Sequence, residues 1–302
     1  MATRALVLSG GGPVGIAWES GLVGGLAAAG VDLSQADFIM GTSAGSFVGA
    51  RLAMGTTPEQ LAAPFLAMDD AAPPPLPSGA SDTRPQAGGP PNMTRLMELM
   101  AGAQADGRSA EEVRVELGKF ALEAKTVSED EFIRSFGRAL SELPDGYWPE
   151  RGYACTAVDA LDGSFHLWTR DSKVDLKRAV ASSCSVPGVY PPITIKGRRY
   201  IDGGMRSGTC ADKASGYEKV VVVAIRAAAT GPMAERAKER LDAEVKVLTD
   251  AGARVEVVYP DDASIAAFGA NMMDARRRPA AAKAGYAQGR AGAAALKAFW
   301  EG

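Results

Sequence analysis

Short apolar runs alternate with longer segments of helical periodicity in the first part of the chain. Residues 4–8 form a short apolar run, and the spacing after it predicts a helix over about 14–29. A second short run, 37–40, precedes a predicted helix over about 44–54, and residues 58–68 again have helical spacing. Strands that alternate with helices in this order indicate a parallel sheet covered by helices on both faces.

The second half of the chain adds further strands to this pattern. The most strand-like run is 220–225, and the Ala- and Gly-rich segment 280–295 predicts a helix that packs on the sheet. The other predicted strands are 151–158, 164–169, 193–195, 200–201 and 254–259, and the other predicted helices include 175–182 and 233–251.

Residues 71–92 depart from the pattern because they are rich in Pro, Gly and Ser. Such a composition predicts a mobile loop rather than a helix or a central strand. Two interpretations stay open, a solvated linker without a role and a flap over an active site. Residues 93–143 follow as a helical insertion, with predicted helices at 93–105, 110–124 and 129–143.

The composition is that of an ordinary soluble globular protein. The 302 residues are 46% hydrophobic and 23% charged, with a formal net charge of −3. This length suffices for one large α/β domain or two small ones, and the net charge gives no support for nucleic-acid binding. The start of the chain leaves no room for a signal peptide, and no apolar stretch reaches the length of about 18 residues that a membrane-spanning helix needs. We therefore expect a cytoplasmic protein.

The supply of histidine and cysteine limits the chemistry. The chain contains one histidine, His166, and three widely spaced cysteines, Cys155, Cys184 and Cys210. This supply weighs against a Cys/His zinc site, and we expect three reduced, mostly buried thiols. A Ser-His-Asp triad would have to use His166, which lies in a predicted strand.

A glycine-rich segment follows the first predicted strand and opens a helix. Gly10, Gly12 and Gly15 match the G-x-G-x-x-G fingerprint of dinucleotide-binding proteins. That fingerprint also needs an acidic residue at the end of the next strand, and this strand ends instead at Met40-Gly41. The fingerprint is therefore incomplete.

The same geometry suits an oxyanion hole. Backbone N–H groups at a helix N-terminus stabilise the negative charge of a developing alkoxide. Pro13 has no N–H, so Gly11 and Gly12 are the better candidate donors, while Gly10 sets the turn. We expect these three glycines to form the oxyanion hole.

Ser43 is the candidate nucleophile that such a hole requires. It lies in a Gly-x-Ser-x-Gly frame, flanked by Gly41 and Gly45, after a predicted strand and before a helix. Flanking glycines relieve crowding where a nucleophile is held on a strained turn. The alternative is a serine that caps the following helix. Because histidine is scarce, the expected base is a carboxylate, and Asp202 is the candidate.

Asp202 begins the sequence Asp202-Gly203-Gly204 after a short predicted strand. An Asp-Gly turn without a catalytic role is the common use of this pair. Upstream, Ala181-Ser182 opens a Ser- and Pro-rich segment that runs to 192. With the glycine-rich loop, the Gly-x-Ser-x-Gly frame, this Ala-Ser-x-x-x-Pro segment and the closing Asp-Gly-Gly in order, the chain resembles the patatin-like phospholipase family over about 5–69 and 150–225.

The resemblance implies a three-layer α/β/α fold with a mostly parallel sheet, formed by one catalytic domain over 1–302. It implies an enzyme, a serine acyl hydrolase with a Ser43–Asp202 dyad, supported by Gly41, Gly45, Gly203 and Gly204, that needs no metal or organic cofactor. An acyl ester or lipid would be the substrate, any membrane contact would be peripheral, and the oligomeric state is not specified. Two alternatives stay open: an acyltransferase or biosynthetic hydrolase with the same dyad, and a non-catalytic protein that binds acyl chains or a partner.

Two positions depart from the family pattern. The family usually carries Lys or Arg where this chain has Val14, which weakens the case for an anionic phospholipid head group. Relatives often have Asn where this chain has Cys210, a change that could loosen the support of Asp202.

Overall fold

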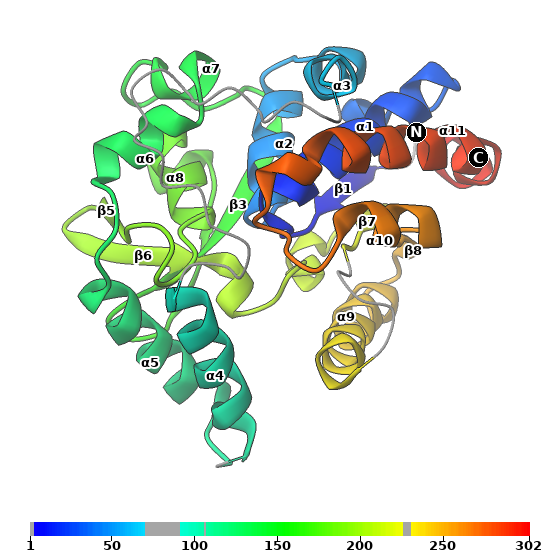
Figure 1. Cartoon of the computed structure of the whole chain (residues 1–302). Helices are drawn as coiled ribbons and strands as arrows, with labels where there is room; N and C mark the ends of the chain where they lie inside the picture. The colour runs from blue at the N-terminus through cyan, green and yellow to red at the C-terminus, as the bar shows by residue number, and fades with distance from the viewer. Residues whose placement is uncertain (1–2, 70–90, 106, 226–230) are drawn as a thin grey trace. The chain divides into compact units, whose positions relative to one another are not determined.

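The computed structural model describes residues 3–69, 91–105, 107–225 and 231–302. Its chain forms two compact units, and each contains segments that are distant in sequence (Figure 1). The first unit contains Met1–Pro74, Pro149–Ala154 and Ser207–Gly302, and the second contains Pro75–Trp148 and Cys155–Arg206. A single domain over 1–302 stays a prediction.

An eight-stranded mixed sheet runs in the order β5-β6-β3-β2-β1-β7-β8, with β4 paired to β3. One half of the sheet is parallel and consists of β2, β1, β7 and β8. The other half is antiparallel and consists of β4, β3, β6 and β5. The predicted α/β fold with a mostly parallel sheet is confirmed. The strands are β1 (Arg4–Leu8), β2 (Phe38–Gly41), β3 (Gly152–Asp159), β4 (Phe165–Trp168), β5 (Ile193–Ile195), β6 (Arg198–Asp202), β7 (Lys219–Val223) and β8 (Arg254–Val258).

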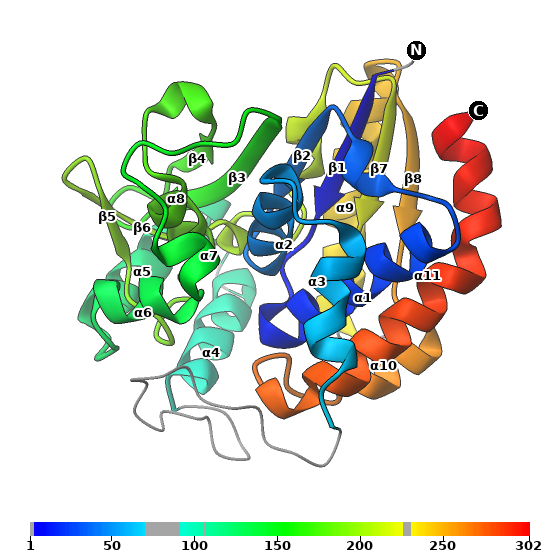
Figure 2. The same cartoon turned by 90° about the horizontal axis from the view of Figure 1, so that it is seen from above.

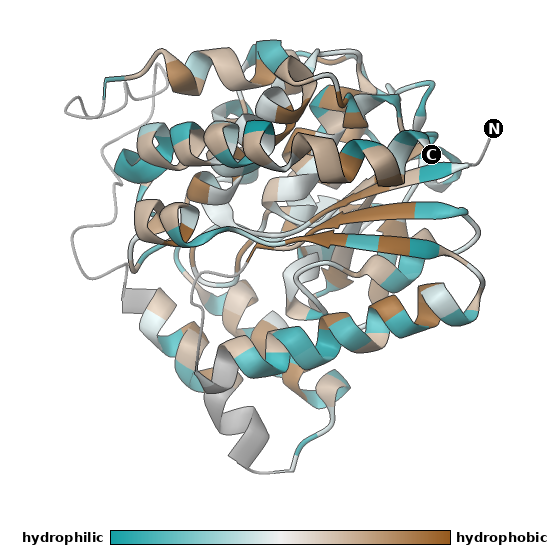
Figure 3. Ribbon diagram, turned by 90° about the vertical axis from the view of Figure 1, so that its right-hand side faces the viewer, coloured by the Kyte–Doolittle hydropathy of each residue, from teal (hydrophilic) through white to brown (hydrophobic). Residues whose placement is uncertain are grey.

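The first unit has the predicted three layers. The central strands of this unit are apolar and buried, as in Val220–Val223 of β7, because a strand covered on both faces is a continuous hydrophobic run. The edge strand β8 is more exposed and carries Arg254 and Glu256. Figures 1 and 2 show α9 on one side of this sheet and α1 with α11 on the other, and Figure 3 shows the strands in hydrophobic colours between them. The helices are α1 (Gly12–Ala28), α2 (Ala44–Ala53), α3 (Pro58–Leu66), α9 (Pro232–Asp250), α10 (Asp262–Phe268) and α11 (Arg278–Glu301).

Helices α1 and α11 pack together at glycines. A Cβ atom at Gly25 of α1 would lie 2.1 Å from the Tyr286 carbonyl oxygen, and one at Gly289 of α11 would lie 2.4 Å from the Leu22 carbonyl oxygen. Absent side chains therefore let the two backbones touch. The Ala- and Gly-rich helix of the sequence thus packs along α1, the helix that follows the glycine-rich segment.

The second unit combines the antiparallel strands with α4 (Pro91–Ala105), α5 (Ala110–Glu123), α6 (Glu129–Ser135), α7 (Arg138–Ser141) and α8 (Leu176–Ser183). Its core joins Leu96 and Leu99 of α4 to Leu117 of α5 and to Val158 and Ile201 of the strands. The prediction of one continuous helix over 129–143 is wrong, because the segment forms two helices, α6 and α7. Gly137, at φ 76°, separates them in a conformation that a helix interior does not allow.

The predicted loop over 71–92 lies outside the described residues except for its last two positions, which begin α4. Among the described helices, none is both long enough and apolar enough to cross a lipid bilayer.

The contact between α1 and α11 predicts opposite effects for two glycines of one helix. Gly289→Ala should lower the free energy of unfolding by about 1–3 kcal/mol, because the added methyl group meets the α1 backbone. Gly292→Ala, where no atom lies within 4 Å of the new Cβ, should raise it by about 0.5–1 kcal/mol through helix propensity. Urea unfolding measures both, and equal changes would contradict the packing argument.

Candidate active site

The glycine loop, residues 10–15, follows β1 in the first unit and includes the first turn of α1. The Gly10 N–H donates a hydrogen bond to the Gly208 carbonyl oxygen at 2.8 Å, which ties the loop to the segment that follows β6. Gly11 occupies the N-cap position of α1, and proline stands in the first turn of that helix. Since the Gly10 N–H already has an acceptor, Gly10 shapes the turn, and its place in an oxyanion hole stays a prediction.

Neighbouring chain segments leave no space for a side chain at Gly11 or Gly12 of this loop. A Cβ atom at Gly11 would lie 2.5 Å from Ile225 Cδ1. Gly12 has φ +59°, and a Cβ there would lie 2.9 Å from both the Met272 carbonyl oxygen and Met273 Sδ. Glycine is therefore required at these positions both by contact and, at Gly12, by the left-handed backbone.

The Gly11 and Gly12 N–H groups have no hydrogen-bond acceptor among the residues that the structure describes. They precede the first intrahelical bonds of α1, so they are among the unsatisfied donors at its positive end. Such groups can receive an anion or a developing oxyanion.

Ser43 lies on a strained turn between β2 and α2. Its backbone has φ 51° and ψ −116°, an uncommon conformation for a residue with a side chain. Gly41 and Gly45 permit the turn: a Cβ at Gly41 would lie 2.2 Å from the Gly45 carbonyl oxygen, and a Cβ at Gly45 would lie 2.3 Å from the Leu8 carbonyl oxygen. Both supporting glycines of the prediction are thus sterically necessary.

The Ser43 side chain does not cap α2, although the residue occupies the N-cap position. The alternative interpretation, a serine whose role is helix capping, therefore loses its main support. The side chain is 7% exposed. Its Cβ lies 3.4 Å from the position that a Gly10 Cβ would occupy, so the first unit brings Ser43 and the glycine loop together.

Asp202 ends β6 in the second unit and is 1% exposed. Its Oδ1 accepts a hydrogen bond from the Gly204 N–H at 2.7 Å, and its own N–H donates to the Ser185 carbonyl oxygen at 3.0 Å. Gly203 is required, because a Cβ there would lie 2.0 Å from Thr156 Oγ1. The Asp-Gly-Gly sequence thus forms a tight turn that fixes one carboxylate oxygen of Asp202.

A model of the patatin-like phospholipase family matches residues 6–214 of this chain, which include the glycine loop, Ser43 and Asp202. The chain belongs to the patatin-like phospholipase family. This family is typically one of serine acyl hydrolases, and the sequence-based resemblance is confirmed.

Two solved structures are similar to this chain. The crystal structure of VipD from Legionella pneumophila has a TM-score of 0.46 at 13% identity, over 98% of this chain and 67% of VipD. The type III effector protein ExoU has a TM-score of 0.37 at 17% identity, over 96% of this chain and 54% of ExoU. Comparison with curated proteins gave no match.

His166 packs in an aromatic cluster, as expected for a structural residue. Its ring stacks on Trp168 with centroids 5.3 Å apart and meets the Tyr200 ring edge-on at 4.9 Å. Its Nε2 lies 3.2 Å from Ser164 Oγ. Burial lowers the pKa of His166, which favours the neutral ring.

Glu19 of α1 is a buried acid that the sequence analysis did not identify. It is 0% exposed, and neither carboxylate oxygen has a hydrogen-bond partner of good geometry among the described residues. It follows Gly11 and Gly15 at helical spacing, and Gly15 faces Ala44 of α2. Burial raises the pKa of Glu19 well above its ordinary value. The Ser9 N–H lowers the pKa of Glu19 and so partly opposes this rise. The same N–H also donates a hydrogen bond to the Val223 carbonyl oxygen at 3.1 Å.

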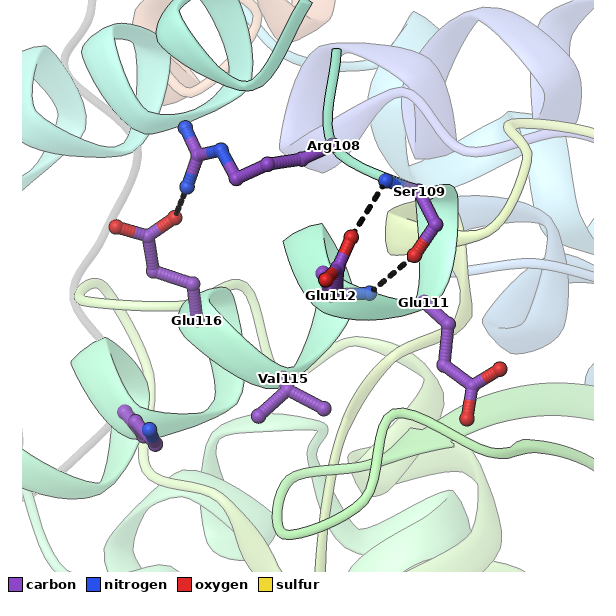
Figure 4. A pocket seen from close by; sticks show the side chains of 7 residues that line it. Arg108, Ser109, Glu111, Glu112, Val115 and Glu116 are labelled. Carbon is purple, nitrogen blue, oxygen red and sulfur yellow. Dashed lines mark hydrogen bonds and ion pairs between the residues drawn. The ribbon is translucent and has the colours of Figure 1, made fainter. Parts of the chain in front are cut away.

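An open hollow on α5 in the second unit is separate from these residues (Figure 4). Ser109 and Glu112 form a capping box there, and Arg108 pairs with Glu116. None of the predicted site residues lines it.

The Gly208 carbonyl and the Met272–Met273 segment also contact the glycine loop, and neither is predicted from the sequence. No local spacing marks them, because they lie far along the chain. Glu19 did leave a signal, since it is the one acidic residue on the otherwise uncharged α1.

The raised pKa of Glu19 predicts a pH-dependent cost to stability. Below the ordinary carboxyl pKa, both folded and unfolded states hold the proton. Above it, only the unfolded state ionises freely, so stability falls by up to about 1.4 kcal/mol per pH unit until the pH passes the folded-state pKa. Glu19→Met should therefore be more stable than wild type, with a gain that is larger at pH 8 than at pH 5.

Glu19→Gln is the matched control, because it keeps the shape and polarity but cannot ionise. Its unfolding free energy, measured by urea titration between pH 5 and pH 8, should lack the part of the pH slope that Glu19 causes. A wild-type slope that both variants retain would show that Glu19 ionises in the folded protein as easily as in the unfolded chain.

Proposed function

We propose that the protein is a serine acyl hydrolase in which Ser43 is the nucleophile and Asp202 the general base. The observation that carries the proposal is the strained Ser43 turn beside the glycine loop, where the Gly11 and Gly12 N–H groups lack acceptors among the described residues. A strained serine turn next to unsatisfied backbone donors is the arrangement that acyl transfer requires.

In the first step, Ser43 Oγ attacks the acyl carbonyl carbon while Asp202 accepts the hydroxyl proton. The carbonyl oxygen becomes an oxyanion, which the Gly11 and Gly12 N–H groups stabilise. Collapse of this intermediate breaks the ester bond, and the alcohol leaves with the proton from Asp202. The product is an acyl-enzyme.

In the second step, water attacks the acyl-enzyme and Asp202 accepts its proton. The second tetrahedral intermediate uses the same two donors. Its collapse releases the carboxylic acid and returns the proton to Ser43. Asp202 suits this role because its Oδ1 is fixed by Gly204 while the residue is almost fully buried, which strengthens its interaction with a proton donor.

Val14 bears on the substrate. Its side chain is fully buried and its N–H donates to the Met272 carbonyl oxygen at 3.2 Å. The position where relatives carry a cation thus belongs to the core of the first unit in this chain. We therefore favour a neutral acyl ester or a lysolipid over an anionic phospholipid.

The dyad predicts the behaviour of a fluorophosphonate probe. Wild type should form one covalent adduct at Ser43, detected by intact mass and peptide mapping. Ser43→Ala should form none and should lose ester turnover by about 10⁴-fold or more. Asp202→Asn should slow labelling and turnover by about 10²–10⁴-fold, the usual contribution of a general base.

Asp171 is an exposed aspartate of the same unit as Asp202. Asp171→Asn is therefore the control and should be labelled at the wild-type rate. Absence of an adduct on the folded wild-type protein would contradict the hydrolase proposal and favour a binding role. An adduct with turnover only when an alcohol acceptor is present would favour an acyltransferase.

A further inference from the structure

Glu244 of α9 is a buried carboxylate with a defined set of partners. It is 6% exposed, and its Oε2 accepts hydrogen bonds from Thr209 Oγ1 at 2.6 Å and from the Ala211 N–H at 2.8 Å. A single oxygen thus binds two donors from one short segment, residues 207–211, which we call the 207–211 loop. Hydrogen bonds to a charged acceptor are stronger than neutral ones.

The 207–211 loop is irregular and buried, with Cys210 and Ala211 fully enclosed. It contains no helix or strand before η4 (Ala211–Ala214), and Cys210 adopts a left-handed conformation at φ 50°. Within the loop, Ser207 Oγ accepts the Thr209 and Cys210 N–H groups at 3.3 and 3.2 Å. These internal bonds shape the loop, and the bonds to Glu244 attach it to α9.

The same loop holds the glycine loop. The Gly208 carbonyl oxygen accepts the Gly10 N–H at 2.8 Å. Gly208 directly precedes Thr209, the first of the two residues that Glu244 restrains. A displacement of the 207–211 loop would therefore move the acceptor of Gly10 and, with it, the donors at Gly11 and Gly12.

We propose that Glu244 is a positioning residue that fixes the 207–211 loop and, through Gly208, the oxyanion donors of the glycine loop. This inference rests on the proposed function. Glu244 acts from α9, on the opposite side of the sheet from α1 (Figure 1), through its bonds to Thr209 and Ala211. Displacement of oxyanion donors by about 1 Å can reduce turnover roughly 10²-fold, so a distant carboxylate can control the rate.

Three variants test the proposal in the full-length protein with a short p-nitrophenyl ester. Glu244→Leu removes the acceptor and should lower kcat roughly 10- to 100-fold with little change in KM. Glu244→Gln keeps an acceptor oxygen and should restore kcat to within about threefold of wild type. Thr209→Val removes one of the two bonds and should give an intermediate loss, and it serves if Glu244→Leu does not fold.

Glu239→Leu, an exposed residue of the same helix, is the matched control and should keep wild-type kcat. The proposal is overturned if folded Glu244→Leu keeps kcat within twofold of wild type. It is also overturned if Glu244→Gln loses as much as Glu244→Leu, because burial of a charge rather than an acceptor would then be the cause.

Hydrogen–deuterium exchange separates this inference from the proposed function. In Glu244→Leu, the amides of peptides that cover residues 8–16 should exchange faster than in wild type, whereas Glu239→Leu should leave them unchanged. If wild type shows no fluorophosphonate adduct but the exchange still rises in Glu244→Leu, the proposed function fails and the positioning contact stands. If turnover is normal and exchange does not change, the positioning proposal fails alone.

Discussion

The close approach of the serine turn to the end of β1 is the constraint on which the candidate site depends. The Gly45 N–H donates to the Ser9 carbonyl oxygen at 2.9 Å, and the Thr42 N–H donates to the Leu8 carbonyl oxygen at 3.0 Å. A side chain at Gly45 would meet the β1 backbone. Because the glycine loop begins where β1 ends, this contact places Ser43, the proposed nucleophile, beside the glycine loop that we propose as the oxyanion hole. The strain at Ser43 is maintained by the packing around it rather than by its own preference.

Packing of neighbouring helices and loops holds the glycine loop in place. The glycine loop continues into α1, and α1 packs on α11 through glycines that allow backbone contact. On the other side of the sheet, Glu244 restrains the 207–211 loop, whose Gly208 carbonyl accepts the Gly10 N–H. The loop is thus restrained by a helix behind it and by a hydrogen bond beside it. Preorganised donors need no rearrangement when charge develops, which is the source of their effect on rate.

Much of the first unit could be predicted from the sequence, because its strands are continuous apolar runs and its turns carry glycines at fixed offsets. Ser43, the glycine loop and Asp202 all follow strands, and the structure places each of them at a strand end. The division of the predicted 129–143 helix into two was not predicted, because a glycine inside a helical pattern does not by itself indicate the left-handed conformation that Gly137 adopts. Glu244 and Gly208 could not be found, because their contacts join segments that have no common periodicity.

The two buried glutamates show why partners, not burial alone, decide what a carboxylate does. Glu244 has two donors on one oxygen, so its burial is compensated and it can restrain a loop as an acceptor. Among the described residues neither Glu19 oxygen has a comparable pair of donors, and burial raises its pKa because the charged form is not compensated. A neutral Glu19 also adds no negative charge one helical turn beyond the glycine loop, where an ionised carboxylate would oppose an oxyanion. The lack of hydrogen-bond donors at Glu19 among the described residues is therefore compatible with the proposed chemistry. Loss of the two donors to Glu244 would instead release the 207–211 loop, which holds the proposed oxyanion hole.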